Sequence, residues 1–124
     1  MHKLILVLLM VTASGSTMAE WLKVDSDKIG TYYADPSSMQ EIGNKILMTD
    51  LAEMLPNGKP FSVKTQREYD CQKQQVRIMS MAAYHGIMGE GEEIFNHQNH
   101  EEWQTIMKSS PLESLFRLAC RKKK

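Results

Sequence analysis

Two short stretches of this sequence carry residue types that bind metals. The first, "MSMAAYHGIM" (79–88), offers thioethers and an imidazole, a ligand set that suits Cu(I): Met79, Met81, His85 and Met88. In a strand, Met79 and Met81 would project from the same face of the sheet. Methionine is also an ordinary filler of protein cores, so these side chains could equally lie under a helix. Copper handling is therefore kept as an alternative to a structural role.

The second stretch is "HQNHEE" (97–102), which supplies two imidazoles and two carboxylates: His97, His100, Glu101 and Glu102. In a helix, residues three or four apart would share a face and could hold one ion. A solvated polar loop explains the same composition. The sequence contains no nucleophile elbow, zinc-protease motif, phosphate-binding loop or dinucleotide fingerprint. We therefore expect no enzyme activity and no cofactor.

The first 19 residues have the layout of an export signal. A short basic start precedes the ten-residue apolar run of residues 4–13, and small residues precede a cleavage site between Ala19 and Glu20. The run is too short to cross a bilayer, which needs about 20 apolar residues. The sequence predicts a signal peptide over 1–19 and one mature domain over 20–124, without a transmembrane segment and without a cysteine near the cut for a lipid anchor.

The two cysteines, Cys71 and Cys120, are expected to form one disulfide. An exported protein matures in an oxidising compartment, where paired cysteines persist as disulfides. The sequence has no CxxC motif, and a structural zinc site would need four closely spaced ligands. In the chain-entropy model, closing a loop of this length stabilises the fold by roughly 4 kcal/mol.

Charge is nearly balanced in the predicted mature chain. It keeps all 15 acidic residues and 14 of the 15 lysines and arginines, so its formal net charge is 14 − 15 = −1. A nucleic-acid-binding domain would need a basic face, so that class is not expected. The basic end of the chain could contact an anionic partner such as a sulfated glycan or lipid headgroup, or serve only as a solvated tail: Arg121, Lys122, Lys123 and Lys124.

The elements that must position these residues are mostly strands. Alternation of apolar and polar residues is clearest in 61–71, where Phe61, Val63 and Tyr69 share the apolar face. A break is expected at Asp35-Pro36, a turn at "PNGKP" (56–60), and Cys71 at the tip of a hairpin. The expected strands are 20–27, 28–36, 45–55 (where a helix remains an alternative), 61–71, 75–84 and a short edge strand at 94–95. The segments between these strands are expected to lack regular structure: a connector at 36–45, a glycine-rich loop at 85–93 and an irregular polar stretch at 96–106.

The C-terminal stretch "SSPLESLFRLAC" (109–120) predicts an amphipathic helix. Ser110, Pro111 and Glu113 form a capping box with proline at the first helical position. Leu112, Leu115 and later apolar residues recur at helical spacing. The predicted fold is α+β: an antiparallel sheet of about five or six strands, with a C-terminal helix packed on it and joined to it by one disulfide.

The ordered set of features resembles the surface-adhesin protein E family of Gram-negative bacteria. The resemblance rests on "EW" at the start of the mature chain, "TYYADPSSM" (31–39), "SVKTQREYDCQKQQVRIMSMAAYHGIMGEGE" (62–92) and "LESLFRLAC" (112–120). It implies a small exported, non-enzymatic binding domain located in the periplasm or at the cell surface and outer membrane. It further implies host matrix or serum proteins such as vitronectin and laminin as partners, and a homodimer.

Overall fold

The computed structural model describes residues 20–121. The predicted signal peptide, and with it Ala19 of the predicted cleavage site, lies outside this part of the chain. Lys122, Lys123 and Lys124 of the predicted basic end lie outside it as well.

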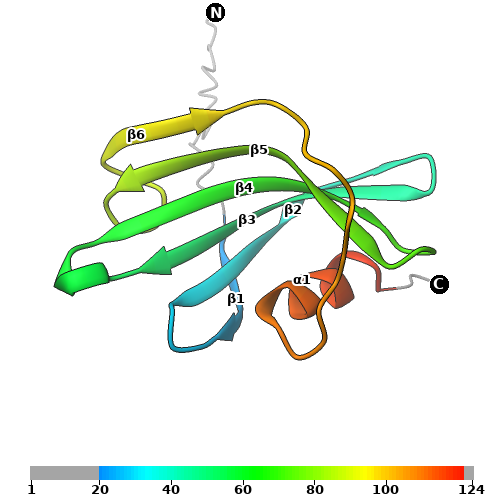
Figure 1. Ribbon diagram of the computed structural model, residues 1–124, viewed down its shortest axis with the longest axis horizontal. Helices are drawn as coiled ribbons and strands as arrows, with labels where there is room; N and C mark the ends of the chain where they lie inside the picture. The colour runs from blue at the N-terminus through cyan, green and yellow to red at the C-terminus, as the bar shows by residue number, and fades with distance from the viewer. Residues whose placement is uncertain (1–19, 122–124) are drawn as a thin grey trace, which may run out of the picture.

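The described residues form one antiparallel sheet with a single α-helix on it (Figure 1). The first six strands lie in the order β1-β2-β3-β4-β5-β6, so that each of β1 to β5 pairs with the next strand, and the very short β7 pairs with β5. The α+β prediction is confirmed, and residues 45–54 form a strand rather than a helix. The elements are β1 (Leu22–Ser26), β2 (Thr31–Ile42), β3 (Lys45–Met54), the 3-10 turn η1 (Pro56–Gly58), β4 (Phe61–Asp70), β5 (Gln75–His85), β6 (Glu92–His97), β7 (Gln104–Thr105) and α1 (Pro111–Ala119).

The expected break at Asp35-Pro36 is wrong, because β2 continues through it to Ile42. Pairing of β2 with β3 is irregular between Asp35 and Gln40, and an irregularity of this kind tolerates a proline that cannot donate to the ladder. The hydroxyl of Ser38 accepts a hydrogen bond of 2.8 Å from the Thr49 N–H. The Ser38 side chain thus supplies the acceptor that the backbone of β2 does not offer to Thr49 at the irregularity. Residues 36–42, which were expected to be part of a connector, instead belong to β2 and to the long β2–β3 hairpin.

Both faces of β4 are buried, which corrects the expected division into an apolar and a polar face. Tyr69 is fully buried on the apolar face, and Ser62, Glu68 and Asp70 are buried on the other. Each of these polar side chains has a partner there. The Ser62 hydroxyl, for example, donates to Gly86 O and accepts from Gly89 N–H, both at 2.8 Å, which holds the β5–β6 loop against the sheet.

α1 covers the β1–β3 side of one sheet face, as Figure 1 shows. Its predicted cap is present: Ser110 Oγ accepts from Glu113 N–H at 3.2 Å, and Glu113 Oε1 accepts from Ser109 N–H at 2.8 Å. The Ser114 hydroxyl also donates to Asp25 of β1 at 2.9 Å. The core beneath the helix is a cluster of six buried residues: Ala34, Met48, Tyr69, Val76, Leu115 and Ala119.

Candidate functional site

Cys71 and Cys120 form the predicted disulfide. Cys71 begins the four-residue turn between β4 and β5, and Cys120 is the C-cap residue of α1. Their Cα atoms lie 5.6 Å apart. The bond therefore fastens the end of the helix to the β4–β5 hairpin, in addition to the contacts that α1 makes with β1, β2 and β3.

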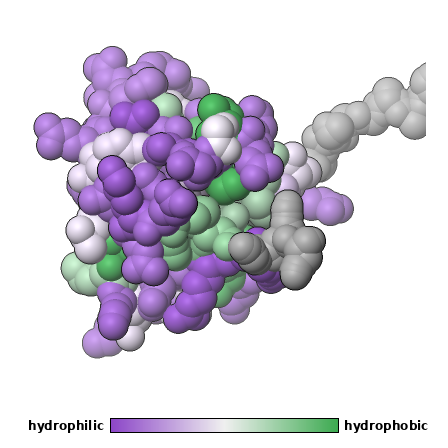
Figure 2. Space-filling view, turned by 90° about the vertical axis from the view of Figure 1, so that its right-hand side faces the viewer, coloured by the Kyte–Doolittle hydropathy of each residue, from purple (hydrophilic) through white to green (hydrophobic). Residues whose placement is uncertain are grey.

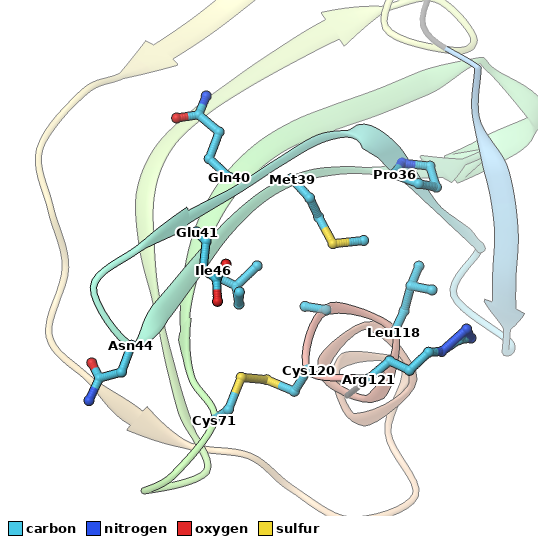
Figure 3. A pocket seen from close by; sticks show the side chains of 11 residues that line it. Pro36, Met39, Gln40, Glu41, Asn44, Ile46, Cys71, Leu118, Cys120 and Arg121 are labelled. Atoms are coloured by element: carbon cyan, nitrogen blue, oxygen red, sulfur yellow. A yellow bond between two sulfur atoms is a disulfide. The ribbon is translucent and has the colours of Figure 1, made fainter. Parts of the chain in front are cut away.

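Beside the disulfide lies an open groove of about 760 Å³ between the β2–β3 hairpin and the end of α1 (Figure 3). Met39 and Ile46 on the hairpin and Leu118 on the helix are partly buried and line it with apolar groups. Glu41 and Arg121 are the charged residues of its lining. Figure 2 looks at this end of the molecule and shows a hydrophobic area bordered by hydrophilic residues.

The sequence did not indicate this groove. Met39 was expected in a connector, and nothing in the local pattern places it opposite Leu118. Met39 is followed by the exposed residues Gln40, Glu41 and Ile42, so no apolar–polar alternation marks the strand past Pro36.

A second surface lies at the β6 edge of the sheet and is called here the β6 surface: Ile94, Phe95 and His97. Ile94 and Phe95 are 41% and 49% exposed, which is high for large apolar side chains. The rings of Phe95 and His97 stack with centroids 6.2 Å apart. Within residues 20–121, no strand pairs with the outer edge of β6. The sequence predicted an edge strand here, although at 94–95 alone.

The pairing of the strands places Phe95 on the sheet face that carries the helix. Phe95 lies on a part of that face that the helix does not reach. Phe95 pairs with Ala83 of β5, which in turn pairs with Val63 of β4. α1 contacts β1, β2 and β3. The β6 surface is therefore an exposed apolar part of a sheet face whose other part is the core.

A buried ion pair lies inside the sheet. Arg67 Nε donates to Asp50 Oδ2 at 2.6 Å, and its Nη2 donates to Oδ1 at 3.3 Å. Burial raises the pKa of the Asp50 carboxyl, and the charge and hydrogen bonds of Arg67 oppose that rise. Burial, together with Asp50, raises the pKa of the Tyr69 phenol, whose oxygen finds no hydrogen-bond partner among residues 20–121. None of the three side chains lines the groove, and we assign them a structural role.

The methionines of the first predicted metal stretch are spread over the β5–β6 region. Pairing of β5 with β4 shifts between Ser80 and Ile78, leaving Met79 at a β-bulge. The bulge puts Ile78 on the same face as Met81, because their partners Arg67 and Thr65 share a face of β4. The pairing does not assign the Met79 side chain to a face, so a shared face for Met79 and Met81 stays a prediction. Met81 pairs with His97, His85 is exposed at the end of β5, and Met88 lies in the following loop. Copper binding stays a prediction.

The second metal stretch is extended rather than helical. His97 ends β6, and its Nε2 lies 3.3 Å from Glu101 Oε2. His100 and Glu102 are exposed. Across the part of the chain that the structure describes, no three side chains among histidine, cysteine, aspartate and glutamate are grouped closely enough to hold a metal ion.

A family comparison decides which class of protein this architecture represents. The model of the family "Surface-adhesin protein E" matches residues 21–121, almost all of the described chain. The chain belongs to the surface-adhesin protein E family. Among curated proteins none matches it.

Solved structures of surface-adhesin protein E have the same fold. Protein E from Haemophilus influenzae, in its crystal form II, is 10% identical with a TM-score of 0.64, over 91% of this chain and 96% of that chain. A second structure of Haemophilus influenzae protein E is 11% identical with a TM-score of 0.61, over 89% and 90%. At this level of identity the likeness shows a shared fold.

Membership of the surface-adhesin protein E family indicates an exported protein of the surface-adhesin type. α1 has nine residues, and nowhere in residues 20–121 does a helix have the length and hydrophobicity to span a membrane.

Proposed function

We propose that this chain is an exported, non-enzymatic adhesin that binds a protein ligand through the β6 surface. The ligands we propose are host matrix or serum proteins, with vitronectin and laminin as the first to test. The proposed location is the envelope of a Gram-negative cell, in the periplasm or on the outer surface, after removal of residues 1–19. A homodimer is part of the same proposal.

The observation that carries this proposal is Phe95, half exposed on an edge strand. An edge strand presents unpaired N–H and C=O groups to any extended chain that approaches it. Added strands of this kind supply affinity through the main chain and specificity through neighbouring side-chain pockets. Exposed aromatic side chains are common energetic centres of protein interfaces, because they bury a large apolar area with little loss of side-chain freedom.

Charged residues beside the aromatic pair give this surface a polar border. Glu92 and Glu93 precede Ile94 and are exposed, and the Asn96 amide donates to Glu93 at 3.0 Å. Interfaces commonly combine an apolar centre with a polar border that stays hydrated. Acidic residues at an edge also disfavour pairing between identical strands, so the ligand that we expect here is neutral or basic.

The first experiment determines where the protein is and whether it binds. Cells that make the protein are separated into periplasm, outer membrane and medium, and intact cells are labelled with an antibody against the protein. Purified protein is then tested for binding to immobilised vitronectin and laminin. Surface labelling together with saturable binding supports the proposal. Strictly periplasmic protein would contradict adhesion to host proteins.

A pair of matched variants distinguishes specific binding through the β6 surface from nonspecific hydrophobic binding. Phe95→Ala removes the exposed aromatic, and we expect it to weaken ligand binding by about tenfold or more. Ile29→Ala is the control, because Ile29 is 66% exposed in the β1–β2 turn, away from β6. Equal binding by both variants and the unmodified protein would show that the β6 surface is not the binding site.

A further inference from the structure

The groove between the β2–β3 hairpin and α1 has the size and lining of a small-molecule site. Its volume of about 760 Å³ lies within the roughly 300–1,000 Å³ typical of ligand pockets. Met39 of β2, Ile46 of β3 and Leu118 of α1 project into it, as Figure 3 shows. The disulfide forms part of the same wall. An apolar ligand that enters the groove would displace the water in contact with these side chains.

The groove has a negative charge on its hairpin side and a positive charge at the end of the helix. Glu41 lines it from the hairpin side, and Arg121 lines it just beyond the helix C-terminus. Arg121 makes no ion pair within residues 20–121, so its guanidinium is free to meet an anion. The sequence continues directly from Arg121 into Lys122, Lys123 and Lys124, so up to four positive charges follow one another at this end of the chain.

We propose that this groove binds a single-chain anionic amphiphile of the fatty-acid type. Its acyl chain lies along Met39, Ile46 and Leu118, and its carboxylate meets Arg121. Glu41 also lines the groove and is negatively charged. A ligand with a cationic headgroup would place that headgroup at Glu41 and would therefore lie in the groove in the reverse orientation. The proposal concerns a different part of the molecule from the β6 surface, and it stands whether or not the protein is an adhesin.

The tail of the chain is a less suitable occupant. Lysine side chains carry a strongly hydrated charge at their tips, and a run of three supplies no apolar group to fill an apolar groove. Arg121 instead matches the carboxylate end of the ligand, where bidentate pairing with a guanidinium is favourable.

The test uses dodecanoate, kept below its micelle concentration, and the ¹⁵N-labelled protein purified from cells that export it. We expect saturable shifts of backbone amide signals in residues 39–46 and 118–121. Affinity should rise by about fourfold for each methylene added to the chain until the groove is full. Shifts confined to the β6 surface, shifts that do not saturate, or no shifts would overturn the proposal.

Headgroup charge is tested with three ligands of equal chain length. Dodecanoate should bind more tightly than both the neutral dodecyl maltoside and the cationic dodecyltrimethylammonium. Equal affinities would show that the apolar lining acts alone, and tighter binding of the cation would show that Glu41 is the recognition group. Either result would overturn the assignment of an anionic ligand.

Single substitutions locate the carboxylate. Arg121→Gln should weaken dodecanoate binding by about two- to fivefold, the effect of one partly exposed charge pair. Glu41→Gln should strengthen binding by a similar factor. Lys59→Gln is the matched control, because it changes the net charge as Arg121→Gln does but lies in the turn before β4, outside the groove lining. If Lys59→Gln weakened dodecanoate binding as much as Arg121→Gln does, the effect would come from net charge alone, and Arg121 would not be the carboxylate site.

Two further variants test the groove itself. Met39→Trp fills it and should abolish binding, while the circular-dichroism spectrum and melting temperature show whether the protein is still folded. Deletion of residues 122–124 should weaken binding by removing positive charge. If the deletion strengthens binding instead, the tail itself occupies the groove and the proposal is wrong.

Discussion

Cys71 and Cys120 join the β4–β5 turn to the last residue of the helix, at the wall of the groove. At its other end the helix is tied to β1 by the hydrogen bond from Ser114 to Asp25. The disulfide thus adds a covalent link to the β4–β5 hairpin, where Tyr69 and Val76 already pack under the helix with Leu115 and Ala119. Together with the contacts of α1 to β2 and β3, this link holds the end of the helix beside the β2–β3 hairpin.

Replacing both cysteines by serine tests the contribution of this link. We expect the Cys71→Ser, Cys120→Ser variant to lose about 2–5 kcal/mol of unfolding free energy, because the unfolded chain regains the freedom of a long loop. Urea unfolding followed by circular dichroism measures the loss. The unmodified protein in the presence of a reductant should match the variant. Equal stability of oxidised protein and variant would disprove the structural role.

Removing one partner of the buried ion pair should be strongly destabilising. Asp50→Asn leaves the Arg67 guanidinium in the sheet without its counter-charge, which we expect to cost about 3–5 kcal/mol of unfolding free energy. Asp50→Leu combined with Arg67→Met removes both charges and should cost much less than Asp50→Asn alone. Arg117→Gln is the exposed comparison, since its 3.4 Å pair with Glu113 lies at the surface and should contribute about 1 kcal/mol or less. A similar loss for Asp50→Asn and Arg117→Gln would contradict the role of burial.

Acid stability should depend on Asp70 in the β4–β5 turn. The hydrogen bond from the Lys73 N–H lowers the pKa of Asp70, and the charge of Lys45 and the Gln72 N–H act in the same direction, although burial opposes them. A carboxyl whose pKa is lower in the folded state stabilises the fold fully above its unfolded pKa of about 3.9. That contribution is lost as the pH falls through the folded pKa.

The measurement is the unfolding free energy of Asp70→Asn against pH. We expect the variant to be less stable than the unmodified protein at neutral pH and to lose less stability on acidification below about pH 4. Glu90→Gln removes an exposed carboxylate from the β5–β6 loop and is the control. A variant curve parallel to that of the unmodified protein would show that Asp70 does not cause the acid sensitivity.

Ser38 should be the residue that allows β2 to pass Pro36. In Ser38→Ala the Thr49 N–H loses its acceptor, and we expect a cost of about 1–3 kcal/mol of unfolding free energy. Ser37→Ala is the matched control, because the Ser37 hydroxyl donates to Asp35 at the exposed surface. Thermal unfolding of both variants gives the comparison. If Ser37→Ala is the more damaging change, the proposed role of Ser38 is wrong.

Much of this protein was predictable because the signals are local. The capping box at Ser110 predicts the helix start because it satisfies the first free N–H groups of the helix without any distant partner. "PNGKP" likewise predicts its turn, since Asn57 and Gly58 adopt positive φ there. Cys71 and Cys120 predict their bond because an exported chain with two cysteines has a single possible pairing.

Other features were decided by partners distant in the sequence. Pro36 lies inside a strand because Ser38 meets Thr49 across the hairpin. Ile78 and Ser80 lie on opposite faces of β5 because a bulge at Met79 changes the pairing with β4.

The sequence by itself determined the helix, the turns, the disulfide and the antiparallel sheet, because each follows from bonding within a few residues or from a single possible pairing. Tertiary structure alone decided the groove and the extent of the β6 surface. The groove needs Met39 and Leu118 brought together from opposite ends of the domain. The exposure of Phe95 depends on how far a nine-residue helix reaches across the sheet.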